Sequence, residues 1–175
     1  TEMADASGMT TWYYDARGQS MGEYRQVNGV GLFAAAWDYN DAGLVREMWY
    51  PGGSQGQLGE KVSYSYHSQQ ALNTLTSASF GNYVENSSYD AEGRLRVRRV
   101  GSSVHMAASR EYQPWSQGGR LYRLGAGNLD TMQAFFLLQY SYDAVGNITG
   151  IADQANPTLT QSFTYDILAR LTAAS

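Results

Sequence analysis

The sequence predicts an all-β protein built as an array of short antiparallel hairpins, and three observations lead to this prediction. First, one seven-residue pattern, Tyr-Asp-x-x-Gly-x-aliphatic, returns along the chain at regular spacing, which indicates a repeat architecture. Second, tyrosine and glycine are abundant, with 14 and 19 residues, whereas only 16 % of residues are charged. Third, no stretch keeps apolar residues at helical spacing over three turns; residues 127–138 come nearest.

The pattern occurs in about seven copies. Those that begin at Tyr142 and Tyr89 are the clearest, and the others are degenerate. Their anchors lie at 14, 39, 66, 89, 115, 142 and 165, so successive copies begin 23 to 27 residues apart. The residues assigned to the copies are Tyr14, Asp15, Gly18, Tyr39, Asn40, Gly43, Tyr66, Leu72, Tyr89, Asp90, Gly93, Leu95, Trp115, Gly119, Leu121, Tyr142, Asp143, Gly146, Ile148, Tyr165, Asp166 and Leu171.

Each position of the pattern has a physical role in a hairpin. The aromatic anchor usually follows another aromatic by two residues, as in Trp12 and Tyr14, which places both on one face of a strand. Asp or Asn can bond the backbone two residues on and start a turn. Gly supplies the positive φ that closes the turn. The aliphatic residue then begins the return strand and packs across from the tyrosine.

The first four units follow from this register. Residues 1–11 lead into unit 12–33, where Asn28-Gly29 marks a further hairpin. Unit 34–60 contains the punctuated loop 51–56, in which we expect Gly56 to tolerate substitution better than Gly146. In unit 61–83, Gln70 replaces the turn glycine. Unit 84–110 has the cleanest strand alternation, over residues 94–99.

The last three units cover residues 111–135, 136–160 and 161–175, and the first of them carries the Trp115 variant. No linker or change of composition separates any of the units. We therefore expect about fourteen strands, two per repeat, in one solenoid-like domain that spans residues 1–175 and belongs to a longer protein.

The repeats resemble the YD repeats of the Rhs/YD-repeat family, which includes bacterial Rhs polymorphic toxins, the C components of Tc insecticidal toxin complexes and animal teneurins. The resemblance spans nearly the whole chain, and it implies a strip of β-sheet that winds into a hollow shell. It also implies a structural, non-catalytic role: the shell encloses a C-terminal toxin in a bacterial protein that is secreted or displayed on the cell surface. The family's self-cleavage element contains Asp-Pro, and no proline here follows Asp.

The resemblance implies that the partners are neighbouring repeats and the enclosed toxin polypeptide, and exposed edge strands could also associate with each other. The alternative is an adhesion or carbohydrate-binding module, in which sugars would stack on exposed aromatics. The candidates for such platforms are Trp49, Tyr50, Tyr83 and Trp115.

Composition and spacing argue against other classes of function. The net charge of −4 argues against nucleic acid as a general partner, and no apolar run is long enough to span a membrane. Cysteine is absent, and His67 and His105 are the only histidines, so we expect no metal or other cofactor. Gly52-Gly53-Ser54-Gln55-Gly56 matches the nucleophile elbow of hydrolases, but no helix is predicted after it, so we expect no catalytic serine.

Overall fold

The computed structural model describes residues 1–175 and confirms an all-β fold. Fifteen strands follow one another in chain order, and the paired neighbours are antiparallel. The only helical elements are two single-turn 3₁₀ helices, and no helix is long and apolar enough to cross a membrane. The chain forms two compact units, Thr1–Asn86 and Ser87–Ser175, with the boundary inside strand β8.

The first unit contains seven complete strands and most of the eighth. Their bounds are β1 Glu2–Asp5, β2 Gly8–Tyr14, β3 Ser20–Val27, β4 Gly31–Tyr39, β5 Val45–Pro51, β6 Leu58–Tyr66, β7 Leu72–Ser77 and β8 Gly81–Tyr89. The second unit contains the remaining strands and both 3₁₀ helices. Their bounds are β9 Leu95–Val100, β10 Met106–Tyr112, η1 Trp115–Gln117, β11 Leu121–Asn128, β12 Gln133–Tyr142, β13 Ile148–Asp153, η2 Pro157–Leu159, β14 Gln161–Tyr165 and β15 Leu171–Ala174.

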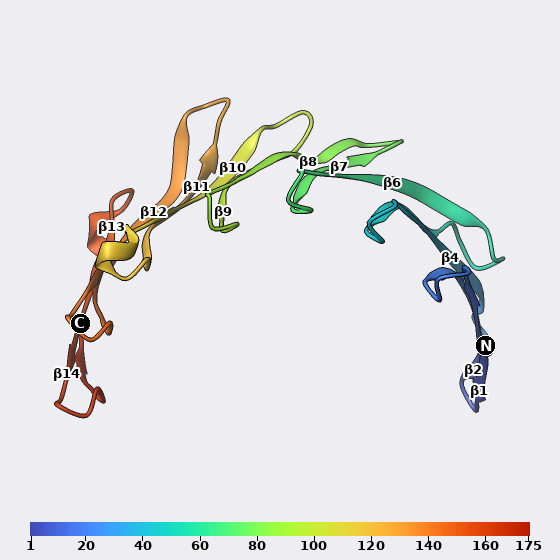
Figure 1. The fold of residues 1–175 in the computed structure, drawn as a ribbon, viewed down its shortest axis with the longest axis horizontal. Helices are drawn as coiled ribbons and strands as arrows, with labels where there is room; N and C mark the ends of the chain where they lie inside the picture. The colour runs from blue at the N-terminus through green and yellow to red at the C-terminus, as the bar shows by residue number, and fades with distance from the viewer. The chain divides into compact units, whose positions relative to one another are not determined.

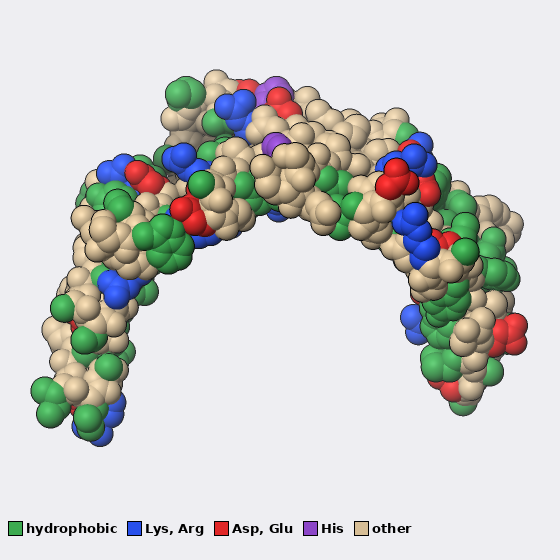
Figure 2. Space-filling view, in the orientation of Figure 1, with side chains coloured by type: hydrophobic (Ala, Val, Ile, Leu, Met, Phe, Trp, Pro, Cys, Tyr) green, Lys and Arg blue, Asp and Glu red, His purple; other side chains and the backbone are tan.

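Each unit is a single layer of sheet, and no second layer of elements covers it (Figure 1). The apolar core is therefore thin: Ala34, Val62 and Val84 are its buried members. The visible surface mixes apolar and polar side chains, and acidic and basic groups are interspersed (Figure 2). A layer of this kind gains little from a hydrophobic core, so its stability must rest largely on contacts along the sheet.

A register shift lies beside the anchor tyrosine of the hairpins. At the first turn Tyr13 pairs with Gly22 but Tyr14 pairs with Ser20, so Met21 is an extra residue on the return strand. The same shift precedes Tyr39 and Tyr142, among others. The extra residue is a β-bulge, which increases the local twist of the sheet. The first strand stays regular, so Trp12 and Tyr14 keep the alternation expected for one face.

The return strands begin at the expected aliphatic residues, because Val45, Leu72, Leu95, Ile148 and Leu171 are each the first residue of a strand. The fifth repeat differs from its assignment. Tyr112, and not Trp115, is the residue that pairs with Leu121, and Trp115 lies in η1 inside the turn. The turn is longer here, and it is closed by a hydrogen bond from the N–H of Gln113 to the carbonyl of Arg120 at 2.7 Å.

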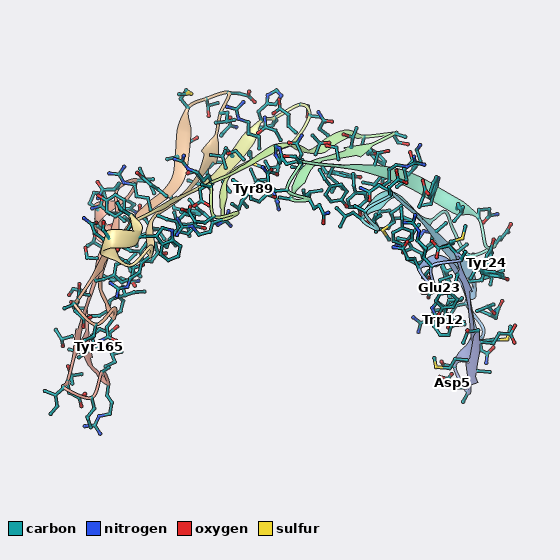
Figure 3. The ribbon with its side chains drawn as sticks, in the orientation of Figure 1. Asp5, Trp12, Glu23, Tyr24, Tyr89 and Tyr165 are labelled. Atoms are coloured by element: carbon teal, nitrogen blue, oxygen red, sulfur yellow. The ribbon has the colours of Figure 1, made fainter.

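The segment 127–138, which came nearest to a helical pattern, lies instead in strands β11 and β12 and the turn between them. The apolar residues of this segment alternate between the two faces of the β11–β12 hairpin. Pairing of the two strands, rather than local propensity, decides their conformation. Figure 3 shows the alternation in the first unit, where Trp12 and Glu23 lie on one side of the strands and Tyr24 on the other. Trp12 Nε1–H donates to a carboxylate oxygen of Glu23 at 3.2 Å.

Candidate functional site: the seam between consecutive turns

The turns after the anchors share one hydrogen-bond scheme. In the first turn, Oδ1 of Asp15 accepts hydrogen bonds from the backbone N–H groups of Arg17 and Gln19, at 2.8 and 2.9 Å. The N–H of Asp15 donates to the carbonyl of Gln19, and the N–H of Gly18 donates to the carbonyl of Asp15. One carboxylate therefore satisfies two backbone donors that the turn leaves unpaired.

Five of the other six turns keep the backbone part of this scheme with different residue types, and the longer fifth turn is the exception. The backbone closure is the same at Asn40, His67, Asp90, Asp143 and Asp166. Gly18, Gly43, Gly93 and Gly146 have φ of +78° to +104°, the region that glycine enters without a Cβ clash, and Gln70 and Ala169 adopt positive φ where glycine is replaced. The closing geometry, rather than the exact sequence, is what the repeats have in common.

The carboxylates that close three turns have pKa values below the ordinary value of 3.8. At Asp166, hydrogen bonds from the backbone N–H and the guanidinium of Arg170 lower the pKa. Desolvation acts to raise the pKa of Asp90 and of Asp143. At Asp90 it is outweighed by hydrogen bonds and the charge of Arg94 together with the backbone N–H of Glu92, and at Asp143 by hydrogen bonds from Asn147 and from the backbone N–H groups of the turn. The folded turn therefore stabilises the ionised carboxylate.

We expect the stability of the protein to decrease as the pH falls below 3.8, the ordinary carboxyl pKa. Below that pH the unfolded chain binds more protons than the folded turns, so the stabilisation is lost as the pH falls through the lower folded values. Asp143→Asn keeps an oxygen that can accept the backbone hydrogen bonds, as Asn40 does, but it cannot titrate. Urea unfolding at a series of pH values should give a shallower decline for this variant. An unchanged decline would contradict a role for this carboxylate.

Consecutive turns are joined by the hydroxyl groups of the anchor tyrosines. Tyr39 Oη–H donates to the carbonyl of Ser20 at 2.7 Å, and Tyr66 Oη–H donates to the carbonyl of Val45 at 2.6 Å. In the second unit the donors are Tyr112 and Tyr142, and the acceptors are the carbonyls of Leu95 at 3.4 Å and Leu121 at 2.6 Å. Each acceptor follows the turn glycine of the preceding repeat by two residues. We call this row of contacts the turn seam.

The rings at the seam are partly withdrawn from water. Burial raises the pKa of Tyr39, Tyr66 and Tyr142 above the ordinary value of 10.0. Each hydroxyl therefore stays protonated and can donate at any physiological pH. A donated bond in a partly dry setting fixes the distance between one repeat and the next.

A second row of contacts runs beside the first, from the residue that follows the turn glycine. Gln19 Nε2–H donates to the carbonyl of Gly43 at 3.1 Å, and Arg94 Nη1–H donates to the carbonyl of Gly119 at 2.7 Å. Each side chain thus reaches the glycine of the next turn. Because the acceptor is a backbone carbonyl, these contacts depend on the position of the turn and little on its sequence.

Arginine at this place also lies over the next anchor ring. The guanidinium carbon of Arg94 is 4.1 Å from the ring centroid of Tyr112, and that of Arg120 is 5.5 Å from the centroid of Tyr142. These are cation–π distances. The seam therefore combines a hydroxyl bond, a carbonyl bond and ring stacking.

The opposite ends of the hairpins carry other links. His105 and Asp130 join two neighbouring loops, with Nδ1 of His105 2.9 Å from Oδ1 of Asp130 and the backbone N–H of His105 donating to Oδ2 at 2.8 Å. The other histidine, His67, lies at the seam end of the hairpins, where it occupies the turn position of Asp in the third repeat. No group of three or more acidic or histidine side chains is placed to hold a metal ion.

The Gly52–Gly56 loop does not have the strand–turn–helix geometry of a nucleophile elbow, and it instead contacts a neighbouring strand. It is followed by strand β6 and not by a helix. The carbonyl of Ser54 accepts a hydrogen bond from the N–H of Leu32 at 2.8 Å, and the N–H of Gly56 donates to the carbonyl of Leu32 at 2.7 Å. The loop therefore docks on the start of β4, and its backbone, rather than the Ser54 hydroxyl, makes the contact.

The sequence matches no protein-family model and no curated protein. The fold is nevertheless similar to parts of large solved toxin structures. The crystal structure of TcdB2-TccC3-Cdc42 and that of TcdB2-TccC3 without its hypervariable C-terminal region are each 18 % identical to this chain, with a TM-score of 0.77. The pore of the Photorhabdus luminescens Tc holotoxin, carrying a mutation in TccC3, is 19 % identical, with a TM-score of 0.75.

Each of these matches covers 97 % of this chain but only 9 % of the solved chain. The chain thus corresponds to a small part of those proteins, and at this identity the likeness is one of fold. The chain therefore has the fold of a segment of these Tc toxin proteins, which is the fold that its resemblance to the Rhs/YD-repeat family predicts.

Proposed function

We propose that residues 1–175 are a structural wall segment of a YD-repeat shell, which helps to enclose a C-terminal toxin polypeptide in a secreted bacterial toxin system. The turn seam is the observation that carries the proposal. At four of the joints between repeats it links one hairpin to the next through an anchor-tyrosine hydroxyl and a backbone carbonyl, so a wall can be extended without a hydrophobic core. The likeness to Tc toxin structures over 97 % of the chain supports the same role.

The mechanism is steric and needs no covalent chemistry. Within each unit, neighbouring strands pair through their backbone donors and acceptors and so present a barrier, whose partners are the neighbouring repeats and the enclosed polypeptide. Strands β1 and β15 have one paired neighbour each, so their outer edges carry the backbone groups through which further repeats would pair. No catalytic, cofactor or metal residue is part of this proposal.

The test is the mass of the native gene product, followed by protease protection. In the source cells, antibodies against this segment should detect a protein several times larger than 19.3 kDa. In that protein, the polypeptide on the C-terminal side should resist a protease and become sensitive when the seam is weakened by Tyr142→Ala. A native product near 19.3 kDa would contradict the proposal, because seven repeats are too few to enclose a polypeptide.

A further inference from the structure

We infer that a groove on strands β9 to β12 is a binding site for medium-chain aliphatic carboxylates, the class to which short fatty acids belong. The groove lies within the second unit, where these four strands are neighbours (Figure 1), and has a volume of about 350 Å³. That volume is at the lower end of the roughly 300–1,000 Å³ typical of small-molecule sites.

The groove is separate from the turn seam. Leu137, which lines the groove, is an odd number of residues from the anchor rings of Tyr140 and Tyr142 in the same strand, so it lies on the opposite face of the sheet. The inference therefore goes beyond the proposed wall function and does not depend on it.

Small residues form the floor of the groove. Two rows of residues that pair across the strands build it: Val97, Ser109, Gly125 and Leu137 in one row, and Arg99, Ala107, Gly127 and Ala134 in the next. Residues that pair directly, and residues two positions apart in a strand, lie on the same face. The middle strands β10 and β11 therefore contribute only small side chains, and the larger Val97 and Leu137 flank them.

Gly125 shows that the floor is open for a reason other than backbone conformation. Its φ is not positive, so a residue with a side chain could adopt it. Glycine inside a strand often marks the close approach of a ligand or of another backbone. The backbone atom nearest to a Cβ built at Gly125 would be the carbonyl oxygen of Phe136, at an ordinary 3.7 Å. No backbone approach explains this glycine, and a side chain here would enter the groove.

The two ends of the groove differ in polarity. Toward the turn seam, the next residues in register are Glu111 and Arg123, which form an ion pair at 3.4 Å. Neither of them lines the groove, so the groove ends there. Toward the opposite loops, the lining residues are Arg99, Asn128 and Gln133. The rows of Arg99 and Glu111 are about 13 Å apart along β10, at roughly 3.3 Å per residue, a length that suits a medium-chain acid.

The charge at the polar end selects a carboxylate. Arg99 is the one charged residue that lines the groove, and its side chain is exposed and takes part in no ion pair. The carboxylates of Glu111 and Asp130, at either end of these strands, already have partners of their own. A guanidinium group binds a carboxylate through two parallel hydrogen bonds. An aliphatic chain with a carboxylate at one end therefore matches both the floor and the charge.

The experiment is a titration with octanoate of the 175-residue chain, labelled with ¹³C at the methyl groups of its six methionines. Met132 lines the groove and is 86 % exposed, so its methyl group can report a ligand. Octanoate should shift the Met132 resonance saturably and leave that of Met48, in the first unit, unchanged. Octan-1-ol should bind about tenfold more weakly, because it has no charge to pair with Arg99.

Three variants locate the site. Ala107→Leu should abolish saturable binding of both ligands, because the larger side chain fills the floor. Ala108→Leu is the matched control, since it makes the same change at the next residue of β10, on the opposite face, and it should leave binding unchanged. Arg99→Gln, at an exposed position, should weaken octanoate binding about tenfold and leave octan-1-ol binding unchanged.

Four results would overturn the inference or a part of it. The absence of any saturable shift at Met132, with octanoate up to roughly 50 mM, would overturn it entirely, since even weak sites have millimolar affinity. Full binding by Ala107→Leu would overturn the location. Equal affinity for octanoate and octan-1-ol, or tighter binding of octylamine, would overturn the assignment to carboxylates. A Met132 shift that grows with protein concentration, without octanoate, would assign the groove to a second copy of the chain instead.

Discussion

Tyr66→Ala should lower the free energy of unfolding of the first unit by about 3 kcal/mol, at the lower end for removal of a large aromatic because the ring is only half-buried. The change removes both the ring that packs at the seam and the hydrogen bond from Oη–H to the carbonyl of Val45 at 2.6 Å. Tyr66→Phe removes only the bond and should cost about 1 kcal/mol. Urea unfolding followed by far-UV circular dichroism would measure both variants.

Tyr50 provides the matched control for this prediction. It belongs to the same unit, keeps 41 % of its surface exposed and takes no part in the seam. Tyr50→Ala should therefore cost less than about 1 kcal/mol. Hydrogen exchange should also quicken in the turn at residues 39–45 of Tyr66→Ala, because that turn loses its link to the next repeat. Equal costs for Tyr66→Ala and Tyr50→Ala would show that the seam does not hold the repeats together.

Local chemistry made most turns predictable from the sequence. The Asp side chain bonds backbone groups two and four residues ahead, and the glycine adopts positive φ, so both residues are favoured within a span of five. A pattern this short can be read without knowing what surrounds it. The strand that follows begins where the aliphatic residue stands, as at Val45 and Ile148, because the turn fixes the register.

Contacts between repeats were not predictable in the same way. The seam joins residues 17 to 21 positions apart, such as Tyr66 to Val45, and its acceptor is a backbone carbonyl that leaves no mark on the sequence. The extra residue of each bulge likewise has no recognisable sequence pattern. In the fifth repeat, Gln113-Pro114 replaces the Asp, so Tyr112 could not be recognised, although the aromatic at 112 and Leu121 are compatible with a longer turn.

The loop at residues 51–56 shows a further limit. Gly56 was expected to tolerate substitution better than Gly146, but both have positive φ, +77° and +104°. A Cβ at Gly56 would also lie 2.8 Å from a methyl carbon of Leu32, while one at Gly146 would meet the far end of the long Arg120 side chain. The premise that Gly146 needs positive φ and Gly56 does not was therefore wrong. The conformation of Gly56 could not be predicted, because docking of its loop on β4 involves residues more than twenty positions apart.

The second large loss of stability is expected on substitution of Gly31, which lies against the docked loop. Gly29 and Gly31 belong to one hairpin and have φ of +74° and +148°, so an alanine at either position strains the backbone. A Cβ at Gly29 would meet nothing within 4 Å, whereas one at Gly31 would lie 2.6 Å from Cβ of Ser54 and would also clash with its carbonyl oxygen. The two positions therefore differ in whether the loop can stay docked.

Gly29→Ala should cost about 1–2 kcal/mol, the strain of a left-handed alanine. Gly31→Ala should cost about 3–4 kcal/mol, because displacement of the loop adds the loss of two backbone hydrogen bonds with Leu32, at roughly 1 kcal/mol each. Limited proteolysis should then cleave residues 51–58 in Gly31→Ala and leave them intact in Gly29→Ala. Equal stability and equal protection of the two variants would mean that docking of the loop does not stabilise the protein. The cost of a side chain in the hairpin at residues 27–31 would then come from backbone strain alone.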